Sequence, residues 1–254
     1  MPWSVRMASL GALPLAAVGE VGKGFIHERT SETLPCQATS KFFCWDWAKE
    51  HLISRYETPT FQHLELVVIS VAVGFVVAFA LALLAHRYRW LQPPLLAGTG
   101  VLFTIPSVAF FFLLLPFTGR GRDTAIIALT AYTLQIIYRN TIIGLANVPS
   151  SVKDAARGMG LTERQTLWKV ELPLALPEIF AGLQIATVST VAIATLAAFA
   201  HGGGLGEPIL REGISFKTNL IIAGGIAFLI AVSCGLLLYA IQRFLTPWRR
   251  AAAV

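Results

Sequence analysis

A cluster of four glycines in the stretch HGGGLGEP comes nearest, by composition, to a phosphate-binding loop. Its members are Gly202, Gly203, Gly204 and Gly206. Glycine-rich loops can hold phosphate because their backbone N–H groups approach the anion closely. The sequence has no Walker A spacing, G-x-x-x-x-G-K-[ST], and in GEVGK at residues 19–23 the second glycine is too close to the first. We therefore expect no nucleotide site, and tight turns are the alternative role of the cluster.

A polar stripe within an apolar stretch is the second candidate. Gln184, Thr187 and Thr190 recur every three residues, so they share one face of a helix. In a membrane such side chains usually face protein or a water-filled cavity, which makes them candidates for a solute path; helix–helix packing is the alternative. The carboxylates Glu65 and Glu178 fall only near the ends of apolar stretches. This argues against a proton-coupled carrier, which needs a buried ionisable relay.

The cysteines offer little chemistry. Cys36, Cys44 and Cys234 show no CxxC spacing, so we expect no metal site and no redox motif. Cys234 lies in an apolar run and fits a small core residue. Cys36 and Cys44 would form a disulfide if their segment is extracytoplasmic, and two free thiols are the alternative.

The composition identifies the class of protein that holds these residues. Of 254 residues, 55% are hydrophobic and 13% are charged, and the mean hydropathy is +0.66. Soluble domains carry about 25% charged residues, so this chain lacks the polar surface of a soluble protein. An integral membrane protein is predicted. The net charge of +6 then reflects Lys and Arg kept on cytoplasmic loops rather than a nucleic-acid partner.

Five apolar stretches are long enough to cross a bilayer as helices. They are residues 64–85, 95–117, 124–143, 176–200 and 219–241. Pro106 lies inside the second stretch, where we expect a kink. One side of the membrane would hold ten Lys or Arg and the other side's inter-span loops four, so the ten-residue side and the C-terminus are predicted to be cytoplasmic.

The first sixty residues are predicted to form an extracytoplasmic segment. Residues 8–18 are apolar but too short to span, and they could be a signal-like region, a sixth marginal span or an over-extended start. The aromatic-rich sequence FFCWDWAKEHLISRY fits a helix lying along the membrane interface. We therefore divide the chain into residues 1–60, a transmembrane domain of residues 61–245 and a basic cytoplasmic tail of residues 246–254.

The loop between the third and fourth spans, DAARGMGLTERQTLWKVELP, is polar and predicts a short helical hairpin. Ser151 can cap the first helix. Gly158 and Gly160 can end it, because glycine accepts the left-handed conformation. Thr162 and Gln165 have the spacing of a capping box that begins the second helix.

A DNA-binding helix-turn-helix is the first alternative for this hairpin. That motif needs a soluble core and a helix free to enter the major groove, whereas Pro149 and Pro173 leave only a short pair tethered to spans. Docking on a cytoplasmic partner fits better, and packing against the protein's own helix ends is the alternative. The candidate docking residues are Val152, Ala155, Ala156, Met159, Leu161, Leu167 and Trp168.

This loop resembles the cytoplasmic signature of permease subunits of binding-protein-dependent ABC importers. The signature is E-A-A, three residues, G, nine residues, I, one residue, L-P. Its fixed positions here hold Asp154, Ala155, Ala156, Gly160, Val170, Leu172 and Pro173, with every spacing kept. Asp154 replaces the usual Glu, and Val170 replaces the usual Ile.

The resemblance covers about residues 60–245 and points to one branch. TIPS, YRNTIIGL, VELPLALPEIFAGL and ATLAAFAHGGGLGEPI are similar to permeases for glycine betaine, choline, carnitine and related osmoprotectants. His201 before the glycines and Gln135 in the third span depart from the pattern. They could bear on gating or on the particular solute.

The resemblance implies an all-α, polytopic membrane helix bundle of about five spans, or six, with a cytoplasmic coupling-helix loop. Residues 154–160 would dock on a separate ATPase, while Leu172 and Pro173 would set the angle of re-entry into the fourth span. Gln184, Thr187, Thr190 and Pro106 are the candidate translocation path. The four glycines of HGGGLGEP would belong to an external gate.

The implied partners are ABC ATPase subunits, a second permease, identical or not, an extracytoplasmic solute-binding protein and membrane lipid, with no nucleic acid. The chain would carry no cofactor and would not be an enzyme, because ATP and Mg would be bound by the ATPase. A permease for methionine, sulfonate or another small solute stays open as an alternative within the family. A channel or secondary carrier leaves the hairpin unexplained, and a membrane-tethered regulator leaves the other motifs unexplained.

Overall fold

The computed structural model of the chain describes residues 42–212 and 216–248. The chain divides into two compact units, Met1–Cys44 and Trp45–Val254, and the account below concerns the second. Its elements are α3 (Trp45–Arg87), a 3-10 turn (Arg89–Leu91), α4 (Gln92–Thr104), α5 (Ser107–Thr118), α6 (Arg122–Ala146), α7 (Ser150–Gly158), α8 (Glu163–Thr166), a π-helical turn (Leu167–Glu171), α9 (Leu172–Ala194), a 3-10 segment (Thr195–Ala200), α10 (Gly206–Glu212) and α11 (Lys217–Leu245). Within the described ranges every regular element is helical, which confirms the predicted all-α class.

Among the described residues, four helical stretches are long and apolar enough to cross a membrane. They are α3, α6, the run from α8 through the 3-10 segment, and α11, and the bent pair of α4 and α5 makes a fifth if it counts as one span. The prediction of about five spans is confirmed. The sixth span considered for residues 8–18 lies outside the described residues.

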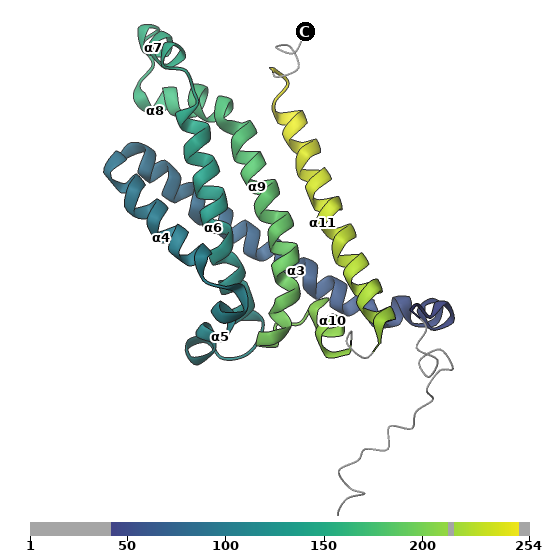
Figure 1. Ribbon diagram of the computed structural model, residues 1–254. Helices are drawn as coiled ribbons and strands as arrows, with labels where there is room; N and C mark the ends of the chain where they lie inside the picture. Colours follow the sequence, from purple (N-terminus) through teal and green to yellow (C-terminus); the bar gives the residue numbers. More distant parts are fainter. Residues whose placement is uncertain (1–41, 213–215, 249–254) are drawn as a thin grey trace, which may run out of the picture. The chain divides into compact units, whose positions relative to one another are not determined.

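Helix α6 is packed between its neighbours. It lies against α3 along one side and α9 along another, and α9 in turn packs against α11 (Figure 1). Small residues allow this close packing. A Cβ added to Gly182 of α9 would lie 2.5 Å from Asn140 Cβ of α6, and one added to Gly74 of α3 would lie 1.7 Å from Thr133 Oγ1. Glycine at such crossings brings helix backbones together, as is usual where packing rather than the hydrophobic effect joins helices in a membrane.

The second predicted span bends at Pro106 as expected, but the bend is a break between two helices rather than a kink within one. Helices α4 and α5 meet at an angle of 99°. Ile105 and Pro106 are both extended, with ψ of 128° and 131°, because proline disfavours a helical conformation in the residue before it. The Tyr132 hydroxyl of α6 donates a hydrogen bond to the carbonyl of Ile105 at this break. The break therefore has a polar partner of the kind that backbone at membrane depth requires.

Helix α3 starts earlier than its apolar run predicts. It begins at Trp45 and continues without interruption through residue 60, where we expected a segment boundary. Its 43 residues correspond to about 64 Å at 1.5 Å per residue, roughly twice the hydrocarbon thickness of a bilayer. The aromatic-rich stretch expected at the interface is thus the first part of the same helix. Hydropathy located the apolar half of α3 but not its full length, because polar residues continue a helix as readily as apolar ones.

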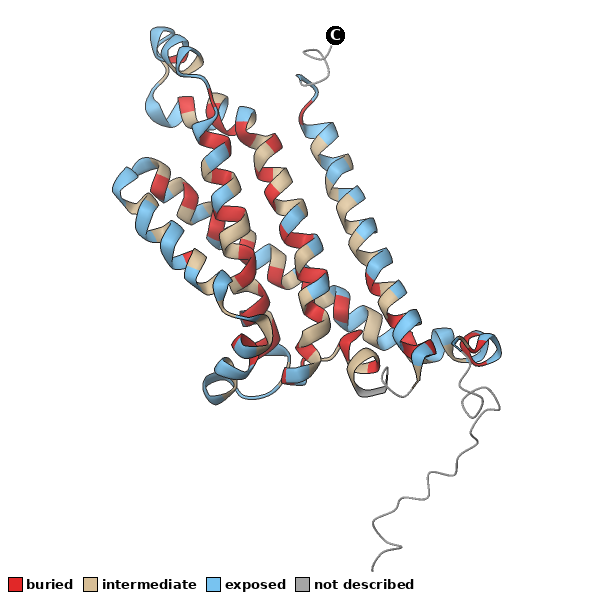
Figure 2. Cartoon of the chain, viewed as in Figure 1, coloured by how far each residue is buried: buried red, intermediate tan, exposed pale blue. Residues whose placement is uncertain are grey.

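Many residues on the outer faces of the helices are exposed in the isolated chain (Figure 2), and many of them are large and apolar. The buried residues of α11 are Thr218, Asn219, Ala223 and Ala227, all in its first half, whereas Phe228 and Phe244 are 67% and 80% exposed. In water such a face would be a liability. In a membrane it is the expected state of a helix that meets lipid or another apolar helix.

We expect Gly182→Ala to destabilise the protein by about 1–3 kcal/mol, because the added methyl overpacks the α6–α9 crossing. Gly98→Ala in α4 is the matched control, since nothing lies within 4 Å of its added Cβ. Thermal unfolding of the purified proteins in detergent measures both. Equal unfolding temperatures for the two variants would show that the crossing is not tightly packed.

Candidate functional site

The hairpin predicted between the third and fourth spans is present as α7 and α8. It follows α6 directly and leads through the π-helical turn into α9. In Figure 1 it lies at one end of α6 and α9, and α5 and α10 lie at the other. The hairpin and the glycine cluster are therefore at opposite ends of α9.

Helix α7 begins two residues earlier than expected. Pro149, extended at φ −58° and ψ 137°, is its N-cap, and no side chain caps it. The Pro149 carbonyl accepts the N–H of Val152 at 3.1 Å and of Lys153 at 3.4 Å. The expected Ser151 cap was wrong, because proline already fixes the extended geometry that a capping residue needs and moves Ser151 into the helix.

Helix α7 ends in a Schellman motif centred on Gly160. The N–H of Leu161 donates to the Ala156 carbonyl at 3.1 Å and the N–H of Gly160 to the Arg157 carbonyl at 2.9 Å, the two bonds that define the motif. Gly160 has φ +80°, whereas Gly158 is the last helical residue and has no positive φ. Of the two glycines in the predicted stop, Gly160 is the one whose backbone requires glycine.

The capping box predicted for the second helix is confirmed. The Gln165 N–H donates to Thr162 Oγ1 at 3.3 Å, and the Thr162 N–H donates to Gln165 Oε1 at 2.9 Å. The docking segment itself is exposed, with Asp154 and Arg157 pairing at 3.6 Å on its surface and Met159 72% exposed. Ala156 is the buried residue of α7 and faces the protein's own chain.

A π-helical turn, Leu167–Glu171, connects α8 to α9, and the sequence analysis did not predict it. The Leu172 N–H donates to the Leu167 carbonyl, five residues back. Pro173 follows within the first turn of α9 and has no N–H to continue the ordinary ladder. Pro173 is the sequence feature that indicates an irregularity here. It shows that one backbone N–H donor is missing, but it does not show that the preceding turn widens to a π-helix.

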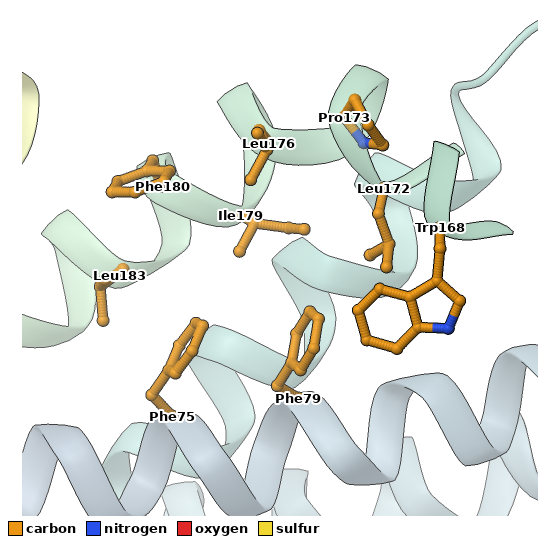
Figure 3. A pocket seen from close by; sticks show the side chains of 9 residues that line it. All are labelled: Phe75, Phe79, Trp168, Leu172, Pro173, Leu176, Ile179, Phe180 and Leu183. Atoms are coloured by element: carbon orange, nitrogen blue, oxygen red, sulfur yellow. The ribbon is translucent and has the colours of Figure 1, made fainter. Parts of the chain in front are cut away.

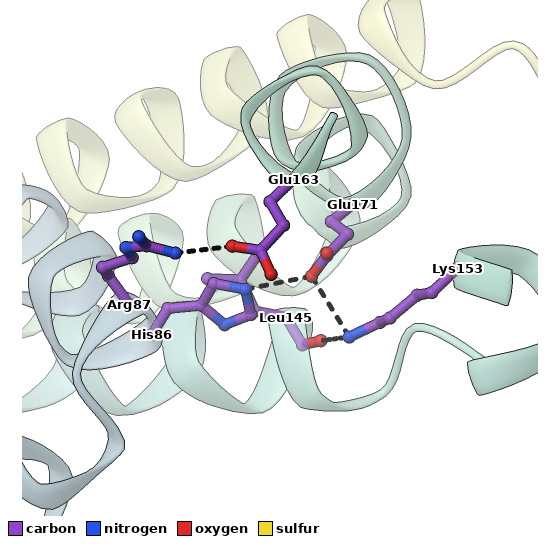
Figure 4. A network of polar contacts seen from close by, with 6 residues as sticks. All are labelled: His86, Arg87, Leu145, Lys153, Glu163 and Glu171. Carbon is purple, nitrogen blue, oxygen red and sulfur yellow. Dashed lines mark hydrogen bonds and ion pairs between the residues drawn. The ribbon is translucent and has the colours of Figure 1, made fainter. Parts of the chain in front are cut away.

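A buried carboxylate ties the hairpin to the spans (Figure 4). Glu171 Oε2 lies 3.1 Å from Lys153 Nζ of α7 and 3.1 Å from His86 Nε2 of α3. Lys153 Nζ also donates to the Leu145 carbonyl at 3.4 Å. Glu163 of α8 pairs with Arg87 at 2.5 Å on the surface. No local sequence pattern indicates this network, because its members are up to 85 residues apart.

The polar stripe of α9 lies within the helix bundle. Thr187 and Thr190, 6% and 2% exposed, each donate to the carbonyl four residues earlier, Leu183 and Ala186, at 2.7 Å. Gln184 Nε2 donates to Gln242 Oε1 of α11 at 2.8 Å. In the single chain the threonine hydroxyls thus bond within α9, and the glutamine pair joins α9 to α11, which is a contact of the helix-packing kind that the sequence left open. Their place in a translocation path stays a prediction, as does that of Pro106 at the α4–α5 break.

The glycine cluster turns the chain between the 3-10 segment and α10. Gly203 and Gly204 have φ of +79° and +82°, and the Gly204 N–H donates to Gln62 Oε1 of α3 at 3.1 Å. A Cβ on Gly206 would lie 1.8 Å from the Thr195 carbonyl oxygen. The tight-turn role therefore has a structural basis, and the gating role stays a prediction.

Two further expectations concern the cysteines and metal binding. The Cys36–Cys44 disulfide includes Cys36, which lies outside the described residues, so this pairing stays a prediction. Among residues 42–212 and 216–248 there is no group of three or more His, Cys, Asp or Glu that could hold a metal ion.

We expect Gly160→Ala to loosen the hairpin, because a left-handed conformation costs a residue with a Cβ about 1–2 kcal/mol. Gly158→Ala is the matched control and is expected to tighten α7 slightly, since its site is helical and open. Hydrogen exchange of peptides covering the hairpin measures both. Equal protection in the two variants would contradict the role of Gly160.

We expect Glu171→Gln to lower stability by about 3–5 kcal/mol, because it leaves the Lys153 ammonium without its buried counter-ion. The control is Glu163→Gln, which breaks a pair whose side chains are 67% and 72% exposed and is expected to cost at most about 1 kcal/mol. Thermal unfolding in detergent compares them. A Glu171→Gln protein as stable as Glu163→Gln would show that the network contributes little.

The chain is similar to known membrane transport proteins. Residues 70–251 match the family described as "Binding-protein-dependent transport system inner membrane component". The chain is 37% identical over 194 residues to the osmoprotectant import permease protein OsmW of Salmonella typhimurium, covering 74% of this chain and 90% of that protein. It is 35% identical over 192 residues to the glycine betaine/carnitine/choline transport system permease protein OpuCD of Bacillus subtilis, covering 75% and 84%.

Solved structures match the fold. The inward-facing MetNI methionine ABC transporter matches with a TM-score of 0.64 at 23% identity, covering 77% of this chain and 98% of that chain. An amino acid ABC transporter matches with a TM-score of 0.62 at 18% identity, covering 73% and 92%. At these identities the likeness concerns the helix arrangement alone.

Proposed function

We propose a transport function from one premise: this chain belongs to the family of binding-protein-dependent transport system inner membrane components. It is a permease subunit of an ATP-driven importer, and its solute is a quaternary-amine osmoprotectant such as glycine betaine, choline or carnitine. One observation carries the choice of solute. Relatives that cover about three quarters of this chain at 35–37% identity are permeases for osmoprotectants, whereas the methionine transporter resembles it at 23%.

In this proposal the exposed α7 is the coupling helix. A separate ATPase binds ATP and Mg and holds α7 in a groove on its surface. The residues that contact the ATPase or fix the shape of the hairpin are Asp154, Ala155, Ala156, Gly158, Gly160, Val170, Leu172 and Pro173. The support is their spacing together with the structure of the hairpin, which is exposed, well capped at α8 and closed by Gly160.

The coupling helix moves with the spans rather than separately. Glu171 connects Lys153 of α7 to His86 of α3, and the π-helical turn leads directly into α9. At the far end of α9, Gly204 is hydrogen-bonded to Gln62 of α3. A displacement of α7 by the ATPase would therefore be transmitted through α9 and α3 as nearly rigid bodies, as alternating access requires.

The proposed assembly contains two permeases, two ATPases and an extracytoplasmic solute-binding protein. The chain lies in the bacterial cytoplasmic membrane with the hairpin and the C-terminus inside. The support for this orientation is the excess of Lys and Arg on that side. The glycine cluster then faces outward, as part of an external gate.

The test of the solute is uptake by the complete transporter reconstituted in proteoliposomes with ATP inside. Glycine betaine, choline, carnitine and methionine are compared at equal concentration, and the solute-binding protein is titrated with the same four. We expect saturable, ATP-dependent uptake of at least one quaternary amine and none of methionine. Uptake of methionine alone would reject the osmoprotectant assignment while leaving the permease assignment intact.

A further inference from the structure

A polar cavity of about 660 Å³ lies between the hairpin and the end of α3. Its lining residues are His86, Arg87, Arg89, Lys153, Arg157, Thr162, Glu163, Arg164, Thr166, Leu167 and Glu171. Five are Lys or Arg and two are Glu, so the lining carries a net charge of +3 with His86 neutral. A cavity with this excess of positive charge attracts an anion.

Three groups of residues that line this cavity lack a partner within the described part of the chain. In the described part of the chain, Arg89 and Arg164 pair with no carboxylate, unlike Arg87, Lys153 and Arg157. The hydroxyl of Thr166 is buried, with the residue 3% exposed, and has no hydrogen-bond partner. A buried hydroxyl without a partner is costly. Two guanidinium groups and a hydroxyl together suit a phosphate group.

An apolar groove of about 250 Å³ lies along the seam between α3 and α9 (Figure 3). Its lining residues are Phe75, Phe79, Trp168, Leu172, Pro173, Leu176, Ile179, Phe180 and Leu183. Phe75 and Phe79 stack with ring centroids 5.5 Å apart. The groove offers only hydrocarbon and aromatic surface, which suits an acyl chain.

The cavity and the groove follow one another along the same seam. Phe79 lines the groove and His86 lines the cavity, and residues seven apart lie on one face of a helix, about 10 Å along its axis. On the opposite wall Leu172 lines the groove and its neighbour Glu171 lines the cavity. One elongated ligand could therefore occupy both.

Aromatic side chains place the meeting point of the cavity and the groove at the level of lipid headgroups. Trp90 is 73% exposed next to Arg89, and Trp168 is 54% exposed at the end of the groove. Exposed tryptophans on a membrane protein gather at the membrane–water interface. A cavity at that level is within reach of a phospholipid headgroup.

We propose that this seam binds an anionic phospholipid, with its phosphate in the Arg89–Arg164–Thr166 cavity and an acyl chain in the groove. The lipid bridges α3, α9 and the coupling hairpin at the place where the hairpin joins the spans. Its negatively charged headgroup offsets part of the positive charge of the two unpaired arginines. Its chain fills apolar surface that the isolated protein leaves open.

The experiment uses the full-length chain in phosphatidylcholine nanodiscs that contain lipid with brominated acyl chains. Brominated phosphatidylglycerol is compared with brominated phosphatidylcholine at equal mole fraction, and Trp168→Phe isolates the fluorescence of Trp168. We expect the anionic lipid to quench Trp168 at a lower mole fraction. Arg89→Gln and Arg164→Gln should each reduce this preference about fivefold, the factor that one cation contributes near an anionic lipid surface.

Arg120→Gln, the same charge change in the loop between α5 and α6, is the control and should leave the preference intact. Inorganic phosphate is added in a separate arm. Loss of the lipid preference at millimolar phosphate would show a site for free phosphate and overturn the lipid assignment. Equal quenching by both lipids, or quenching by neither because protein covers the groove, would also overturn it.

Discussion

The buried carboxylate of Glu171 is the contact on which the hairpin end of the protein depends. It holds the ammonium group of Lys153 on α7 and the imidazole of His86 on α3 at the same 3.1 Å distance. A carboxylate this buried is tolerated only with partners. A movement of α7 that withdrew Lys153 from Glu171 would leave that charge without its cation, so α7 behaves as part of the span bundle rather than as a flexible flap.

Close backbone approach extends this rigidity along the molecule. Gly182 lets α9 meet α6 at Asn140, and Gly206 lets α10 meet the carbonyl of Thr195. Both contacts leave no room for a methyl group. The hairpin, α9 and the glycine cluster thus form one mechanical path, which is the arrangement that a permease driven from the cytoplasm needs.

The apolar groove and the basic cavity add a second kind of contact at the same joint. The cavity is basic and the groove is apolar, just as a phospholipid has a charged headgroup and apolar chains. The two meet where α9 follows the hairpin. A lipid bound there would be part of the joint between ATPase-driven motion and the spans. The polar side chains of α9 that were predicted for a solute path are occupied by protein contacts, because Gln184 is bonded to Gln242 and the two threonines to their own helix.

The sequence by itself determined the class, the spans and the hairpin, because these depend on local properties. A run of about 20 apolar residues predicts a span, and the Thr162–Gln165 capping box and Gly160 stop are set within a few residues. Tertiary structure decided the 99° break at Pro106, the π-helical turn, the Glu171 network and the partner of Gln184. Proline signals a disrupted helix but not its angle, and charges 85 residues apart in sequence meet only after the helices have packed.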